Sequence, residues 1–198
     1  KITYFKGGVE QRMNGTCAGG TGAFIDQMAA LLETDASGLN ELAKGAQQIY
    51  PIAARCGVFA KTDIQALLNQ GASKEDVSAS IFKSVVNQTI GGLAQGREIK
   101  GNVVYLGGPL TFISELRKSF DESLHTVGVS PENSLYFVAL GAGLCSHEKH
   151  KLEDIINAFN NSSAKETYSF NEPLFKNQDE LDAFRYRHSL AKVETYEL

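Results

Sequence analysis

The strongest constraint on the fold is one glycine-rich stretch, Asn14–Gly22, which runs directly into an apolar-periodic segment. It holds four glycines, two threonines and one cysteine, Cys17. Apolar residues recur at helical spacing over 23–33, which predicts a helix that begins where the glycines end. A helix N-terminus presents free N–H groups and the positive end of a dipole, so the stretch suits an anion. A phosphate and a thiolate-bound iron–sulfur cluster are both candidates, and a tight turn beside a small apolar cysteine is the structural alternative.

Composition and charge narrow the class of protein. The chain has 198 residues and a net charge of -4, which gives no general attraction to nucleic acid or to anionic membranes. No apolar run approaches the roughly 20 residues of a membrane helix. Three cysteines in this length do not make a disulfide framework and fit a reducing cytoplasm. The chain opens at Lys1 inside an expected strand, so we expect a fragment of a longer protein.

A second cysteine repeats the context of the first. Cys56 stands beside Gly57 and precedes an apolar-periodic segment that predicts a helix, with Thr62 or Asp63 near its start and Gly71 at its end. Both cysteines therefore come just before a helix and next to glycine. The third, Cys145, lies on the apolar face of a later segment, which favours a structural role.

Two further patterns predict α/β organisation. Ile2–Phe5 and Val9–Met13 flank a Gly-Gly pair and predict a hairpin. The run Asn102–Leu106 is typical of a buried strand, and it opens into Gly107-Gly108-Pro109 and a helix over 110–123. A strand, a glycine pair and a helix in that order are typical of a nucleotide site, because glycine admits a ligand against the backbone. A tight turn between strand and helix is the plain alternative.

The remaining elements are expected from their caps. Asp35 or Ser37 can begin a helix over 39–48. Ser73 followed by Asp76 resembles a capping box and predicts a long helix to about Arg97. Residues 135–139 are compatible with a strand or with the start of a helix.

From His147 the composition changes to charged and loop-like sequence. Residues 178–188 predict a short amphipathic helix, with Leu181 and Phe184 inward. The histidines at 147, 150 and 188 lack partner spacing, which favours surface positions over metal ligation. We interpret this segment as a docking element or a connector.

Four motifs together carry a resemblance to a known family. They are Met13-Asn14-x-x-Cys17-Ala18-x-Gly20-Thr21-Gly22-x-Phe24, Cys56-x-Val58-Phe59-Ala60, Gly107-Gly108 and Leu140-Gly141-Ala142. Over Lys1 to about Cys145 the chain resembles the activators of 2-hydroxyacyl-CoA dehydratases, which share an ATPase family with the ATP-driven subunits of benzoyl-CoA reductase. The resemblance implies an α/β fold of the actin/Hsp70 type (ribonuclease H-like), with a mixed sheet and flanking helices. Residues 1–147 would be the C-terminal half of the ATPase domain, and 148–198 an extension or connector.

The resemblance also implies a function. Proteins of this family work as cytoplasmic homodimers in which two cysteines from each subunit hold one [4Fe–4S] cluster, and ATP drives an electron from it onto a partner dehydratase. Carried over to this sequence, Cys17 and Cys56 become the cluster ligands, and Gly20, Thr21 and Gly22 become contacts on the phosphate side of ATP or ADP with Mg.

On the adenosine side of the nucleotide, the resemblance implies contacts from Gly107, Gly108 and Pro109. The catalytic acid and the other phosphate loops of the family would precede Lys1. The sequence therefore names no catalytic residue, and we expect these 198 residues alone to be inactive as an ATPase.

Three other interpretations are open. The chain could belong to a sugar kinase of the same superfamily, similar to N-acetylglucosamine kinase, with incidental cysteines. It could be a non-catalytic interaction module of a multidomain protein. A zinc site built from Cys17, Cys56 and a histidine is a poorer alternative, because the spacing is not that of a finger or ribbon.

Overall fold

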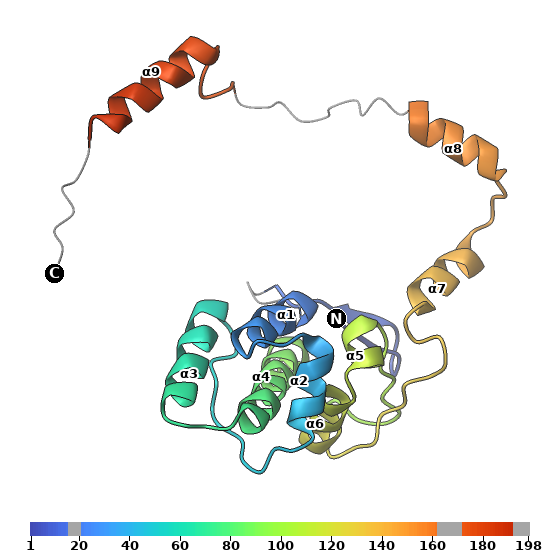
Figure 1. Cartoon of the computed structure of the whole chain (residues 1–198). Helices are drawn as coiled ribbons and strands as arrows, with labels where there is room; N and C mark the ends of the chain where they lie inside the picture. Colours follow the sequence, from blue (N-terminus) through green and yellow to red (C-terminus); the bar gives the residue numbers. More distant parts are fainter. Residues whose placement is uncertain (16–20, 162–171, 192–198) are drawn as a thin grey trace. The chain divides into compact units, whose positions relative to one another are not determined.

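The computed structural model describes residues 1–15, 21–161 and 172–191. The chain divides into two compact units, Lys1–Ser146 and His147–Leu198. The first unit carries the hairpin and helices α1 to α7, and the second carries α8 and α9 (Figure 1).

The hairpin forms as the sequence predicts. Strands β1 (Ile2–Tyr4) and β2 (Glu10–Arg12) pair antiparallel, with Thr3 opposite Gln11. Gly7 and Gly8 in the connection have φ of +82° and +112°, which glycine adopts without strain. The hairpin delivers the chain towards the glycine-rich stretch.

The first four helices follow, with limits that differ from prediction by a few residues. They are α1 (Thr21–Leu31), α2 (Ala36–Ala43), α3 (Gly57–Asn69) and α4 (Lys74–Ala94). Asp35 caps α2 by accepting from the Gly38 N–H, and Ser73 caps α4 by accepting from the Asp76 N–H. Helix α3 begins at Gly57, earlier than expected, and Asp63 lies within the helix, where it accepts from the Ala53 N–H at 2.8 Å.

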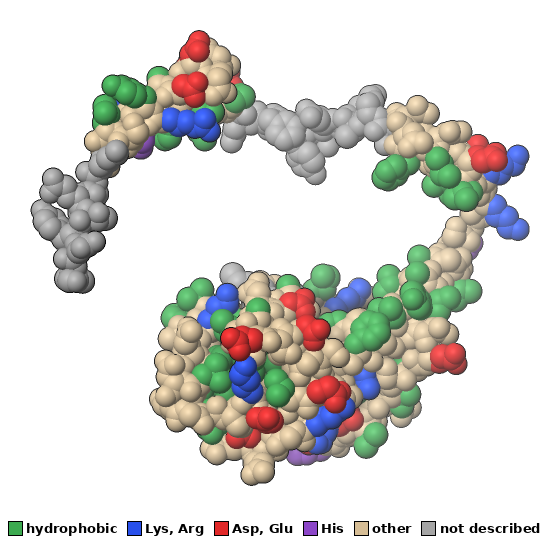
Figure 2. All heavy atoms as spheres, viewed as in Figure 1, with side chains coloured by type: hydrophobic (Ala, Val, Ile, Leu, Met, Phe, Trp, Pro, Cys, Tyr) green, Lys and Arg blue, Asp and Glu red, His purple; other side chains and the backbone are tan. Residues whose placement is uncertain are grey.

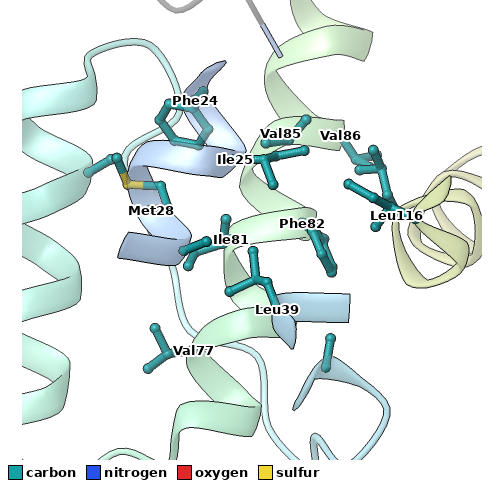
Figure 3. Close-up of a cluster of buried hydrophobic side chains, with 14 of the residues drawn as sticks. Phe24, Ile25, Met28, Leu39, Val77, Ile81, Phe82, Val85, Val86 and Leu116 are labelled. Carbon is teal, nitrogen blue, oxygen red and sulfur yellow. The ribbon is translucent and has the colours of Figure 1, made fainter. Parts of the chain in front are cut away.

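Helix α4 forms the centre of the first unit. It packs against α1, α2, α3 and α6 (Ser114–Leu124). Figure 3 shows the buried cluster at these contacts, where side chains from four helices meet. Its labelled members are Phe24, Ile25, Met28, Leu39, Val77, Ile81, Phe82, Val85, Val86 and Leu116. Tyr105 and Ile113, which lie outside the helices, complete this core around α4.

The prediction of a single helix over 110–123 is wrong. The structure has α5 (Gly108–Phe112) and α6, separated by Ile113 in extended conformation. The break turns the Ile113 side chain into the core, where it is buried. Two side chains satisfy the backbone groups that the break frees: Arg117 donates to the Leu110 and Thr111 carbonyls, and Asn40 Oδ1 accepts from the Glu115 N–H at 2.9 Å. The interruption is therefore stabilised by Asn40, which is distant in sequence, and by Arg117, which lies in α6 itself.

The expected strand 102–106 is reduced to one parallel bridge, between Val104 and Val129. Tyr105 is buried, but Val104 and Leu106 are exposed, so the prediction of a strand buried on both faces holds only in part. In the described residues the mixed sheet of the expected fold is thus represented by the hairpin and this bridge.

Of the two alternatives for residues 135–139, a strand or the start of a helix, the structure has the helix, which is α7 (Phe137–Cys145). Cys145 is exposed at the end of this helix, which corrects the expectation that it packs in a structural, apolar position. The sequence pattern did place it on an apolar face, but that face is open to solvent, since Val138 and Leu144 are also exposed.

The second unit contains α8 (Leu152–Asn161), which the sequence analysis missed, and α9 (Gln178–Ser189), which it predicted. Asn177 caps α9 by accepting from the Glu180 N–H. Leu181 is half-buried. Phe184, which was expected to face inward, is exposed, and its ring lies against that of Phe175 with the centroids 5.2 Å apart. The three histidines of this unit are exposed, as expected.

Candidate nucleotide site and cysteine positions

Two glycine motifs that are far apart in sequence adjoin in space. Thr21 and Gly22 form the first turn of α1, and Pro109 lies in the first turn of α5. A Cβ added at Gly22 would lie 3.7 Å from Cγ of Pro109, and α1 and α5 are in contact. The structure therefore brings together described residues that the family resemblance assigned to the two sides of one nucleotide. Cys17 and Gly20 lie outside the described residues.

The loop at Gly107 is held by a network that sequence reasoning missed. Gly107 has φ +88° and ψ 166°, a conformation open essentially to glycine alone. Its N–H donates to the Ser134 carbonyl at 3.2 Å, and its carbonyl accepts from Thr111 Oγ1 at 2.8 Å. The hydroxyls of Thr111 and Ser134 are also 2.8 Å apart, and Ser134 is buried. A threonine four residues after a glycine is a weak local signal, and nothing local indicated Ser134.

The segment before this loop is fixed by Tyr105. Its N–H donates to the Val129 carbonyl at 2.8 Å, and its hydroxyl donates to Asp121 at 2.7 Å. Burial, and then the Asp121 carboxylate, raise the pKa of the Tyr105 hydroxyl. A Cβ at Gly128 would lie 2.2 Å from the Tyr105 ring, so this close approach requires glycine. The backbone that enters the glycine loop is thus held in place at Tyr105.

Cys56 precedes a helix, as predicted, and it is the N-cap residue of α3. Its thiol is half-buried and makes no capping hydrogen bond. The start of α3 faces α1, since a Cβ at Gly57 would lie 4.0 Å from Oε1 of Gln27. Val58 and Phe59, the next two residues, are 69% and 66% exposed. The cysteine therefore stands at a helix N-terminus beside an exposed apolar pair.

The segment leading to Cys56 is tied to α4. Asp76 accepts from the Gln47 and Gln48 N–H groups at 2.7 and 2.9 Å, and these bonds lower the pKa of its carboxyl. Further along, Ser80 Oγ accepts from the Tyr50 N–H at 2.8 Å. The expected capping box is accordingly half-formed: Ser73 caps α4, but the Asp76 side chain serves this other segment.

Metal ligation by the described residues alone is not supported. Within 1–15, 21–161 and 172–191, no three or more His, Cys, Asp or Glu side chains gather as a group that could hold a metal ion. Of the two cysteines that the resemblance assigns to a cluster, the structure describes Cys56, which is half-buried at the start of α3.

A hollow of about 350 Å³ lies elsewhere, between α2, α4 and α6. Lys44, Lys83, Lys118, Glu115 and Glu122 are among its lining residues, so charges of both signs are present. None of the glycine-loop residues lines it. The hollow is thus separate from the converging glycine turns, which remain the candidate nucleotide site.

Comparison with known proteins gives the family. Residues 4–146 match the BadF/BadG/BcrA/BcrD ATPase family. The chain is 36% identical over 138 residues to the (R)-2-hydroxyglutaryl-CoA dehydratase activating ATPase of Acidaminococcus fermentans, covering 70% of this chain and 52% of that protein. This chain belongs to the BadF/BadG/BcrA/BcrD ATPase family.

Two solved structures are similar to this chain in fold as well as in sequence. The crystal structure of component A of the Acidaminococcus fermentans (R)-2-hydroxyglutaryl-CoA dehydratase superposes with a TM-score of 0.58 at 34% identity, covering 62% of this chain and 47% of that one. The activator of the 2-hydroxyisocaproyl-CoA dehydratase from Clostridium difficile, solved with bound ADPNP, gives 0.56 at 27% identity, covering 76% and 52%. The fold is that of these activator ATPases, of the actin/Hsp70 type, and the chain spans about half the length of the relatives it matches.

No helix among the described residues is both long and apolar enough to cross a membrane.

Proposed function

We propose that this chain is the second half of an ATP-dependent activator, which transfers an electron from a [4Fe–4S] cluster to a 2-hydroxyacyl-CoA dehydratase-type partner. The observation that carries the proposal is the contact between Gly22 and Pro109, because it joins the two glycine motifs that the resemblance assigns to one nucleotide. The relatives named above are activators of such dehydratases, and one was solved with an ATP analogue. The sugar-kinase alternative has no comparable support.

The nucleotide would bind as ATP or ADP with Mg at the converging turns. Gly20, Thr21 and Gly22 would face the phosphates, where α1 offers free N–H groups and the positive end of its dipole. Gly107, Gly108 and Pro109 would face the adenosine. Thr111 and Ser134 hold that loop in place, so its backbone is organised before a ligand arrives. Hydrolysis would also need residues from the half of the relatives' length that this chain does not span.

Cys17 and Cys56 would be the thiolate ligands. When bound, a [4Fe–4S] cluster supplies a single electron at a potential that hydrogen bonds and exposure tune. Four thiolates complete a cluster, so two per chain imply a homodimer with a two-fold axis at the site. Cys56 suits this role because its thiol is half-buried, makes no capping bond and stands at the positive end of α3. The exposed Val58 and Phe59 would then lie near the partner subunit.

The decisive experiment compares cysteine variants of the full-length protein, purified and reconstituted with iron and sulfide under anaerobic conditions. We expect Cys17→Ser and Cys56→Ser to lose iron and the visible cluster absorbance, while MgATP binding persists because neither cysteine is among the proposed nucleotide contacts. Cys145→Ser is the matched control, since this exposed thiol lies outside the proposed site and its loss should change neither property. Full iron content in the Cys56→Ser protein would rule out the proposal.

A further inference from the structure

Asp121, near the end of α6, holds two segments that come from different parts of the chain. Its Oδ1 accepts from the hydroxyl of Tyr105 at 2.7 Å and from the N–H of Gly128 at 2.8 Å. Tyr105 precedes the Gly107 loop, and Gly128 precedes the segment that ends at Ser134. One carboxylate oxygen therefore joins two pieces of chain that meet again at the proposed adenosine side of the nucleotide site.

The core fixes the position of this carboxylate. Helix α6 packs against α4, and its Leu116 and Phe120 side chains are buried. The Phe120 ring centroid lies 6.0 Å from that of Tyr105, which is only 4% exposed. Hydrogen bonds to a carboxylate are stronger than those between neutral groups, and shielding from water strengthens them further. Asp121 is therefore an anchor that the core itself holds in place.

The two segments are also paired through their backbones. The Tyr105 N–H donates to the Val129 carbonyl, and the Val129 N–H donates to the Val103 carbonyl, both at 2.8 Å. These bonds form the parallel bridge between Val104 and Val129. A Cβ at Gly128 would overlap the Tyr105 ring, so the close approach requires glycine. Asp121 thus adds one side-chain bond to each partner of a short backbone pairing.

Beyond this pairing the two segments meet again at the glycine loop. The Gly107 N–H donates to the Ser134 carbonyl at 3.2 Å, and the hydroxyls of Thr111 and Ser134 are 2.8 Å apart. Ser130 donates a further hydroxyl bond to Ser134 at 3.4 Å. Because the partner of Gly107 belongs to the segment that Asp121 holds, a shift of that segment would move the loop.

We infer that Asp121 is a positioning residue for nucleotide binding: it fixes the relative placement of the two segments that form the adenosine loop. It touches no nucleotide in this account and acts through Tyr105 and Gly128. The inference rests on the proposed function for the identity of the ligand, whereas the placement of the loop can be measured without nucleotide. Because the loop is assigned to the adenosine, loss of Asp121 should weaken MgATP and MgADP binding by the same factor.

The test compares full-length proteins that carry Asp121→Ala, Asp121→Asn or Tyr105→Phe. Alanine removes both hydrogen bonds, asparagine keeps an acceptor oxygen, and phenylalanine removes only the hydroxyl from a buried ring. Isothermal titration calorimetry gives the Kd for MgATP and for MgADP. Amide hydrogen exchange without nucleotide is followed at Tyr105, Gly107 and Val129, whose N–H groups hold the loop and the pairing, and in the α4 core.

Two control variants separate positioning from charge and from stability. Glu122→Ala removes the same charge from the next residue of α6, where the side chain is exposed. Ser73→Ala removes the N-cap of α4 and so destabilises the fold through a different helix. We expect both controls to bind MgATP and MgADP as the wild type does.

We expect Asp121→Ala to raise both Kd values at least about tenfold, which corresponds to about 1.4 kcal/mol, and to leave their ratio unchanged. The three loop and pairing amides should exchange faster, by a larger factor than the amides of the α4 core. Asp121→Asn should restore most of both properties, and Tyr105→Phe should lie between the two. If Asp121→Ala does not fold, the graded comparison of Asp121→Asn and Tyr105→Phe with the wild type makes the same test.

Unchanged Kd values in a folded Asp121→Ala protein would overturn the inference, as would equal acceleration of exchange in the loop and the α4 core. An equal loss of affinity in Ser73→Ala would also overturn it, because the effect would then follow stability alone. Failure of the proposed function gives a different result. A wild-type protein that binds neither nucleotide would refute that function, while faster exchange confined to the loop in Asp121→Ala would still show that Asp121 places the loop.

Discussion

Gly107 and Gly108 are adjacent, but the structure predicts opposite consequences for their replacement. Gly107 has a backbone conformation that side chains resist, although no atom lies within 4 Å of an added Cβ. Gly108 has its place in the first turn of α5, and the nearest atom to an added Cβ is Cδ1 of Leu135 at 4.0 Å. The protein itself therefore leaves room for a side chain at Gly108. We expect that this room is used by the nucleotide.

Substitutions at the two glycines should differ in their effects on the free energy of unfolding and on the affinity for MgATP. Gly107→Ala should cost about 1–3 kcal/mol in the free energy of unfolding through backbone strain. Gly108→Ala should change that free energy by less than about 1 kcal/mol, because its conformation suits alanine. Gly108→Val places a branched side chain where the adenosine would approach, and overpacking of about 1–3 kcal/mol would raise the Kd for MgATP about five- to 150-fold.

The assay pairs two measurements on the full-length protein. Denaturant unfolding without nucleotide gives stability, and isothermal titration calorimetry with MgATP and MgADP gives affinity. The reasoning predicts that Gly108→Val loses affinity with little loss of stability, and that Gly107→Ala loses stability. A folded Gly108→Val protein with wild-type affinity for both nucleotides would refute it, as would a loss of stability at Gly108 equal to that at Gly107.

The remaining predictions address other contacts. Asn40→Ala should lower the free energy of unfolding by about 1–3 kcal/mol because the Glu115 N–H loses its partner, whereas Asn40→Asp, which keeps the acceptor, should lose less in the same denaturant titration. Hydrogen bonds from Gln48 and Gln47 lower the pKa of Asp76, so the stability it adds is fully present above its unfolded pKa of about 3.9 and is lost as the pH falls through the lower folded pKa. The difference in unfolding free energy between wild type and Asp76→Asn should narrow over that acidic window, and a difference independent of pH would contradict this. Phe59→Ser should weaken the proposed homodimer without loss of folding, since the ring is exposed in the subunit. Sedimentation in the analytical ultracentrifuge tests this, with Gln65→Ser as a control at another exposed position on α3. Thr21→Ala should keep the iron and reduce the difference in reduction potential between the ADP and ATP states; a redox titration that shows the full difference would exclude Thr21 from the coupling.

Elements governed by local sequence were predictable. The hairpin follows from a glycine pair between two short strands, and α1 follows from apolar periodicity after glycines. Asp35 and Ser73 act as N-caps because the cap bond joins residues only three apart. The candidate glycine turns, and the position of Cys56 before a helix, were accessible for the same reason.

Features that depend on distant residues were not predictable. Apolar periodicity runs through 110–123, yet the helix breaks at Ile113 because the core takes its side chain, and Asn40 and Arg117 satisfy the freed backbone groups. Asp76 binds another segment instead of completing its own capping box. In each case a long-range hydrogen bond or a buried contact outweighs the local preference.

The sequence by itself determined the two glycine motifs, the two cysteine contexts and the family they resemble. It could not determine that Gly22 and Pro109 adjoin, because the packing of α1 and α5 in the tertiary structure creates that contact. Nor could it identify Thr111 and Ser134 as the support of the Gly107 loop, or show that Arg12 donates to the Leu93 and Ala94 carbonyls at the end of α4. A motif records which residues are neighbours along the chain, whereas a site consists of atoms brought within contact distance by a core that the whole chain builds.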